Sequence, residues 1–119
     1  MRRGELTHGG VLLSAELRVC SNFWERARGL LWRAPLDALR AEALLIPSCD
    51  AIHMVGMRYP IAVIFMDAQG VILRQVPRVR PFCMARCGGA AAALECAVDT
   101  PFFNQLSVGD RLEWTLSRG

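Results

Sequence analysis

The sequence lacks lysine and any long apolar segment. All 14 of its basic side chains are arginine and 11 residues are acidic, which gives a formal net charge of +3. With 53% hydrophobic and 21% charged residues among 119, the composition is that of one globular domain and not of a disordered chain. The longest apolar runs, residues 61–66 and 88–94, are far shorter than the ~20 residues of a membrane-spanning helix. We therefore expect a compact domain without a transmembrane helix.

The exclusive use of arginine is explained most simply by the codon usage of a GC-rich genome. The planar guanidinium group does suit the recognition of phosphates and carboxylates. A net charge of +3 is nevertheless small, so nucleic acid is not expected as a partner.

An apolar leader and a disulfide framework are also missing. Glu5, His8, Glu16 and Arg18 interrupt the region where a signal peptide would need an unbroken apolar core. Five cysteines are an odd number, which agrees with a reducing compartment. We expect the protein to begin at Met1 and to stay in the cytoplasm.

Hydrophobic periodicity predicts mostly strands. Residues 11–20 alternate between apolar and polar side chains, as in a half-buried strand. Further strands are expected at residues 42–46, 52–57, 59–66, 71–76, 92–98 and 111–116. Residues 77–81 contain two prolines, which cannot donate ladder hydrogen bonds, and are expected to form an exposed loop.

Two short helices complete the expected elements. Asn22 and Glu25 form a capping pattern for a helix at about 23–32, and Pro101 suits the first position of a helical turn. Together these elements predict a mainly β fold, a compact antiparallel barrel or sandwich of about six to eight short strands.

The most specific pattern in the chain is residues 49–67, CDAIHMVGMRYPIAVIFMD, followed by a turn that ends at Gly70. It places a cysteine, a histidine, a glycine and a proline at fixed offsets before an apolar strand. This stretch resembles the DUF192 family of uncharacterised conserved proteins. Residues 28–33 (RGLLWR), 94–95 (LE) and 108–110 (VGD) are similar to the other motifs of that family.

The resemblance implies a single β-rich domain over residues 1–119, with a core at about 11–116. The family has no established activity. In bacteria its genes sometimes lie near pilus or secretion machinery, which implies an accessory role for the protein.

Candidate binding residues stand on both sides of the predicted central hairpin. In an antiparallel arrangement the two flanking segments could share one end of the sheet, where ligand sites are common. We expect a site there for a small anion or a peptide carboxylate, and an exposed loop edge is the equally weighted alternative. The candidate residues are Cys49, His53, Met57, Arg58, Arg80 and Cys87, with Arg78 and Arg86 nearby.

Two chemical alternatives use the same thiols and histidine. Cys49 and His53 are four residues apart, as are Cys83 and Cys87, but four residues of extended strand span about 13 Å, too far for two ligands of one metal ion. A thiol- or histidine-dependent hydrolase or transferase would need an orienting carboxylate, for which Asp67 and Glu95 are candidates. A metal-binding domain and an enzyme therefore remain as alternatives.

One position departs from the family pattern, because Ala62 stands where relatives commonly have an aspartate. If the family aspartate were catalytic or a metal ligand, this chain would have lost that activity. A role in binding would be affected less by the replacement. We therefore predict a monomeric binding or interaction module rather than an enzyme, without a cofactor. Its expected partner is a protein or a small anionic ligand, and neither nucleic acid nor a membrane.

Overall fold

The computed structural model describes residues 1–22, 25 and 35–117. The expected helix at 23–32 and the motif at 28–33 lie outside the described residues, apart from Glu25. The described part contains nine strands and one 3-10 helix. They are β1 (Arg2–His8), β2 (Val11–Val19), β3 (Ala43–Pro47), β4 (Ala51–His53), β5 (Ile61–Met66), β6 (Ile72–Val79), β7 (Met84–Arg86), β8 (Ala92–Ala97), η1 (Pro101–Gln105) and β9 (Glu113–Leu116).

Seven of the strands form one sheet in the order β6-β5-β8-β3-β2-β1-β9, and β4 and β7 form a separate sheet of two strands. The expectation of a mainly β fold is confirmed. The expectation of a purely antiparallel sheet is wrong at one place, because β2 and β3 run parallel. Parallel neighbours need a connection of a dozen or more residues, and residues 20–42 supply it.

The seven-stranded sheet curls until its two edge strands approach each other, and within the described part of the chain no ladder between them closes it into a barrel. A single bridge joins Val71 to Arg111. The Ile72 N–H donates to the Asp110 carbonyl at 2.8 Å, next to this bridge. Gly70 has φ +84°, and a Cβ atom there would lie 2.3 Å from the Leu112 carbonyl oxygen, so only glycine permits this close approach.

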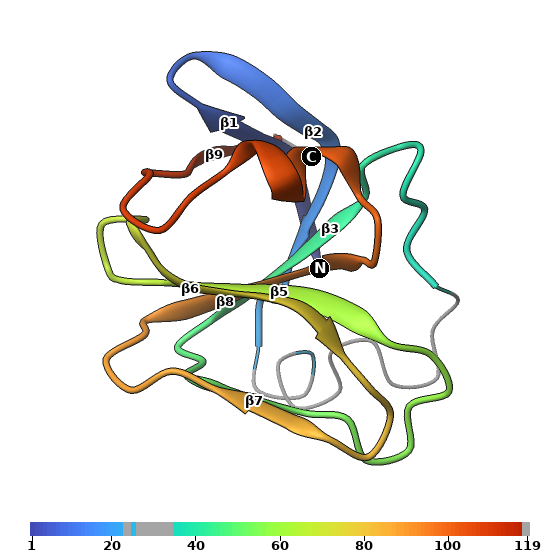
Figure 1. Cartoon of the computed structure of the whole chain (residues 1–119). Coiled ribbons are helices and arrows are strands. Elements are labelled where there is room, and N and C mark those ends of the chain that lie inside the picture. Colours follow the sequence, from blue (N-terminus) through green and yellow to red (C-terminus); the bar gives the residue numbers. More distant parts are fainter. Residues whose placement is uncertain (23–24, 26–34, 118–119) are drawn as a thin grey trace.

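The strands are arranged in three layers, as Figure 1 shows. One half of the curled sheet, with β9, β1 and β2, lies over the other half, with β6, β5 and β8, and the β4–β7 sheet covers the opposite face of that second half. Two apolar cores fill the spaces between the layers. Along β5, Ile64 and Met66 face the first core, and Val63 and Phe65 face the second. The predicted central strand is thus buried on both faces, as expected.

Several boundaries differ from the predictions. The strand expected at 52–57 ends at His53, because the chain turns at Gly56, where φ is +81°. The prediction of a loop at 77–81 is wrong in part, because β6 continues through Pro77 to Val79. β6 is an edge strand, so one of its sides has no neighbouring strand, and a proline there loses no ladder hydrogen bond. The register between β6 and β5 also shifts near this proline. The strands β1 and β7 are not among the elements predicted from the sequence.

Candidate ligand-binding site

The β4–β7 sheet joins the two segments that flank the central β5–β6 hairpin. The strands β4 and β7 pair antiparallel, with Ile52 opposite Ala85. Beyond the ladder, the Cys87 N–H donates to the Asp50 carbonyl at 2.9 Å. Ile52 and Ala85 are both buried in the second core, which fixes the small sheet against β5 and β6. The segments before β5 and after β6 therefore lie side by side on one face of the molecule.

Three of the six candidate residues lie on, or within two residues of, the strands β4 and β7. His53 is exposed at the end of β4. Cys49 is half-buried, and its thiol lies 3.2 Å from the Ala51 carbonyl oxygen. Cys87 is also half-buried beside the second core. No disulfide joins any of the five cysteines, all of which lie in the described part of the chain.

The other three candidates are separated by burial. Met57 is packed inside the second core, whereas Arg58 and Arg80 are exposed. Across the described ranges, no group of three histidine, cysteine, aspartate or glutamate side chains is placed to hold a metal ion. Ligand binding through the six residues together stays a prediction.

The two candidate carboxylates occupy different environments. The Asp67 carboxylate accepts hydrogen bonds from the backbone N–H groups of Gln69 at 2.8 Å and Val71 at 3.0 Å, so it builds the turn between β5 and β6. Glu95 lies on β8 opposite Leu44 and Val63, which belong to the second core. Its Oε2 atom has no hydrogen-bond partner among the described residues, and burial raises the pKa of the carboxyl to about 8.

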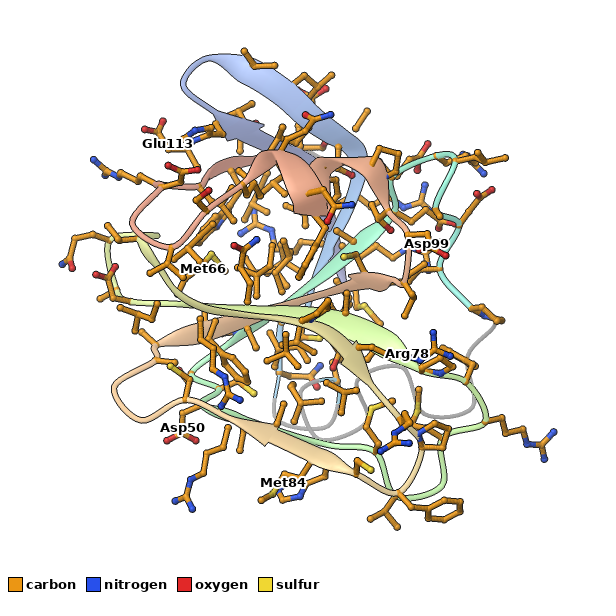
Figure 2. All side chains as sticks on the ribbon, in the orientation of Figure 1. Asp50, Met66, Arg78, Met84, Asp99 and Glu113 are labelled. Atoms are coloured by element: carbon orange, nitrogen blue, oxygen red, sulfur yellow. The ribbon has the colours of Figure 1, made fainter. Side chains whose placement is uncertain are left out.

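A groove of about 340 Å³ opens between β6 and β7, on the face that the β4–β7 sheet forms. Arg78 on β6 and Met84 on β7 lie on its two sides (Figure 2). Four arginines and five uncharged residues line it. The arginines are Arg74, Arg78, Arg80 and Arg86, and the uncharged residues are Val76, Val79, Cys83, Met84 and Ala85.

Among the described residues, this groove carries an excess of positive charge. Within the described residues, none of its four arginines forms an ion pair with a carboxylate. Arg18 and Arg40 elsewhere in the chain do form such pairs, at 3.7 Å with Glu42 and at 2.8 Å with Glu16. Unbalanced charges of one sign along a groove attract ligands of the opposite sign. The charge of the groove is therefore complementary to that of an anion.

Three of these arginines are among the residues predicted from the sequence, and Arg74 is not. A signal for it was present, because Arg74, Val76 and Arg78 recur every second residue, and alternate residues of a strand share one face. The residue spacing does not reveal that β7 lies opposite that face.

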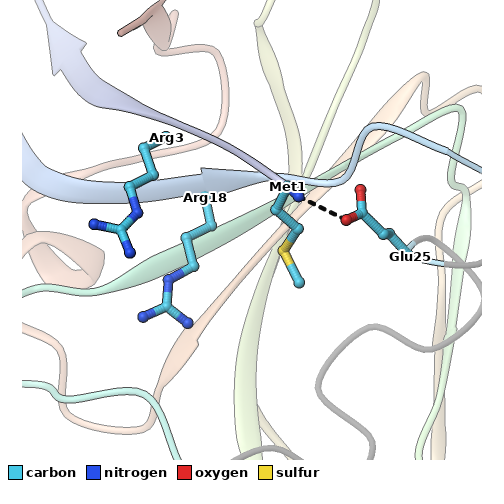
Figure 3. Close-up of a pocket in the computed structure, with 4 residues that line it drawn as sticks. All are labelled: Met1, Arg3, Arg18 and Glu25. Atoms are coloured by element: carbon cyan, nitrogen blue, oxygen red, sulfur yellow. Dashed lines mark hydrogen bonds and ion pairs between the residues drawn. The ribbon is translucent and has the colours of Figure 1, made fainter. Parts of the chain in front are cut away.

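A second hollow, of about 320 Å³, is lined by Met1, Arg3, Arg18 and Glu25 (Figure 3). The amino group of Met1 and the Glu25 carboxylate form an ion pair at 2.7 Å, and Arg18 pairs with Glu42. Charges of both signs thus meet in this hollow, which gives it less attraction for an anion than the β6–β7 groove has.

The motifs along the chain are those of a known family. The DUF192 family model, described as an uncharacterized ACR, matches residues 4–114. The chain belongs to the DUF192 family. No curated protein matches this DUF192 chain. No helix within residues 1–22, 25 and 35–117 has the length and apolar content that crossing a membrane requires.

Two solved structures share the fold of this DUF192 protein. A protein of unknown function from Novosphingobium aromaticivorans DSM 12444 is 18% identical, with a TM-score of 0.72, and the match covers 93% of this chain and 83% of that one. A Sinorhizobium meliloti 1021 protein, described as a proposed transcription regulator, is 20% identical, with a TM-score of 0.75 and coverage of 95% and 92%. Similarity at these identities concerns the fold alone.

Proposed function

We propose that this DUF192 protein is a binding module that captures an anionic ligand in the groove between β6 and β7. The observation that carries the proposal is the set of four arginines along the groove, without a described carboxylate as counter-charge. A guanidinium group donates two parallel hydrogen bonds to a carboxylate or a phosphate, so closely spaced arginines favour ligands that carry several such groups.

Binding suits this groove better than catalysis does. Histidine, aspartate and glutamate, the usual general acids and bases, are missing from its described lining. Cys83 is the one nucleophilic side chain there, and its described neighbours in the groove include no base that could activate it. Arginines hold a negative charge in place but do not exchange protons at neutral pH.

A protein partner fits the groove better than a nucleic acid does. The charge of +3 is small for the whole chain, and the arginines are confined to one groove beside apolar residues such as Val79 and Ala85. A nucleic-acid surface instead presents a broad basic face to the phosphate backbone. We propose the cytoplasm as the compartment, in keeping with the odd number of cysteines.

Calorimetric titration with inorganic triphosphate tests the proposal. We expect binding by the wild type and about tenfold weaker binding by Arg78→Gln/Arg80→Gln, the equivalent of about 1.4 kcal/mol. The matched control is Arg2→Gln/Arg3→Gln, which removes the same charge from exposed positions on β1 and alters the second hollow. Equally weakened binding in both double variants would show that the effect comes from net charge alone. An absence of binding by the wild type would refute the proposal.

A further inference from the structure

Each wall of the arginine groove is a strand at the edge of its sheet. β6 is an edge strand of the seven-stranded sheet, and within the described chain β7 pairs with β4 alone. A free edge presents a row of backbone N–H and C=O groups that can pair with another extended chain. We infer that the groove binds an extended acidic peptide, which adds a strand to the outer edge of β7. This inference rests on the proposed function and specifies its ligand.

The backbone of β7 determines which groups face the groove. On the β4 side, the Cys83 carbonyl accepts from the Met54 N–H at 2.9 Å, and the Cys87 N–H also bonds to the segment of β4. In an antiparallel pair, successive residues direct their backbone groups to opposite sides. Met84 and Arg86 therefore direct theirs away from β4.

A hydrogen bond across the groove agrees with this orientation. The Arg74 guanidinium, on β6, donates from Nη1 to the Arg86 carbonyl. No described backbone group bonds to the outward N–H and C=O of Met84. A peptide strand beside β7 would bond to Met84, and its own N–H would replace Arg74 at the Arg86 carbonyl. The released guanidinium could then pair with a carboxylate of the peptide.

The side chains that line the groove indicate which pattern of residues the peptide should have. Successive side chains of a strand point to opposite faces, so a bound strand presents one row to the apolar floor and one to the arginines. Val79 and Ala85, 3% and 5% exposed, form that floor. Met84, which is 54% exposed, adds apolar surface to the lining of the groove. The fitting peptide alternates acidic and apolar residues.

The same charges disfavour pairing between two copies of this chain. A symmetric contact of two β7 edges would bring the arginines of one copy against those of the other, and like charges on adjacent strands are destabilising. An acidic partner has the complementary charge, so it is the occupant that the groove favours.

The test compares three peptides of about six residues, the ordinary length of a strand. All alternate glutamate and valine, and two of them carry N-methyl groups on alternate backbone nitrogens, one in each of the two possible frames. N-methylation removes hydrogen-bond donors and keeps every carboxylate. We expect the unmodified peptide to bind, and the peptide methylated in the frame that faces β7 to bind at least about tenfold more weakly.

The outcomes separate strand pairing from anion binding. Equal affinity of all three peptides, with weaker binding to Arg78→Gln/Arg80→Gln, would refute strand pairing and leave anion binding intact. An absence of binding for the peptides and for inorganic triphosphate would refute the proposed function too, and the arginines would then serve to protect free edges from other chains. Stronger binding of a DNA duplex than of the peptide, at 0.15 M salt as a rough physiological value, would identify nucleic acid as the ligand and overturn the inference.

Discussion

The Arg74 guanidinium donates a hydrogen bond to the backbone carbonyl of Arg86 and thereby links the edge strand β6 to β7. The two residues are 12 positions apart, and the chain between them forms the rest of the groove. This contact crosses the space in which we propose that a ligand binds. It also ties the small β4–β7 sheet to the larger sheet.

Arg74→Ala is expected to loosen β7 without unfolding the protein. Loss of one partly exposed hydrogen bond lowers the local opening free energy by about 0.5–1.5 kcal/mol. The amides that hold β7 to β4 should therefore exchange at least about three times faster than in the wild type. Hydrogen exchange followed by NMR at the Met54 and Cys87 amides measures this change. Arg78→Ala is the control, since it removes the same charge from the same strand. Equal exchange rates in the two variants would contradict the prediction.

Glu95 makes stability depend on pH. An exposed glutamate carboxyl has an ordinary pKa of 4.5, and burial raises the pKa of Glu95 to about 8 in the folded protein. Between these values the folded state holds up to one proton more than the unfolded state, so the free energy of unfolding falls as pH rises from about 4.5 to about 8 and levels off above that. At low pH, where both states are protonated, the carboxyl contributes no such loss.

Glu95→Gln removes this titration. Relative to the wild type, the variant is expected to gain at least about 1 kcal/mol of stability between pH 5 and pH 9. Urea denaturation at a series of pH values measures the difference. Glu113→Gln, at an exposed position on β9, is the control and should follow the wild type. Parallel profiles for Glu95→Gln and the wild type would show that the buried carboxyl does not titrate in this range.

The position of the family aspartate is apolar in this chain. Ala62 is buried in the first core, opposite Cys96 and away from the β4–β7 sheet. Ala62→Asp is therefore expected to destabilise the fold by about 2 kcal/mol or more, because it buries a carboxyl among apolar neighbours. Ala68→Asp, in the exposed turn after β5, is the matched control. A loss below about 1 kcal/mol on urea denaturation would mean that the core still offers a partner for an acid.

The candidate residues at the β4–β7 sheet differ in burial and should differ in stability effect. Met57→Ala is expected to cost about 2–5 kcal/mol, because it leaves a cavity in the second core. His53→Ala and Arg58→Ala, at exposed positions, should cost less than about 0.5 kcal/mol each. Urea denaturation of the three variants compares them directly. A loss above 2 kcal/mol, roughly the effect of a broken buried contact, in either exposed variant would place that side chain in a buried network instead.

Part of the fold could be predicted because local patterns decided it. The run 61–66 is apolar on both faces, and β5 is buried on both faces. Pro101 begins the 3-10 helix as expected, with Phe102 buried. By contrast, β1 carries Arg2, Arg3 and Glu5 and turns few residues inward, so its pattern is weak. The strand β7 has three residues, too few for any periodicity to be detected.

The candidate site depended on contacts that spacing alone does not encode. The arginines at 78, 80 and 86 were visible as a basic rim in the sequence. The edge positions of β6 and β7 follow from the order of the strands in the two sheets, which is a property of long-range packing. The parallel pairing of β2 and β3 was hidden for the same reason, since it is made across the connection at residues 20–42.

Mapping of the binding surface by NMR tests the proposed site most directly. On addition of the alternating glutamate–valine peptide, the largest amide shifts are expected at residues 74–76, 78–80 and 83–86, and Arg78→Gln/Arg80→Gln should abolish them at the same peptide concentration. The Arg2→Gln/Arg3→Gln control should retain them. Shifts confined to β1 and the second hollow, or no shifts at all, would contradict anion capture between β6 and β7.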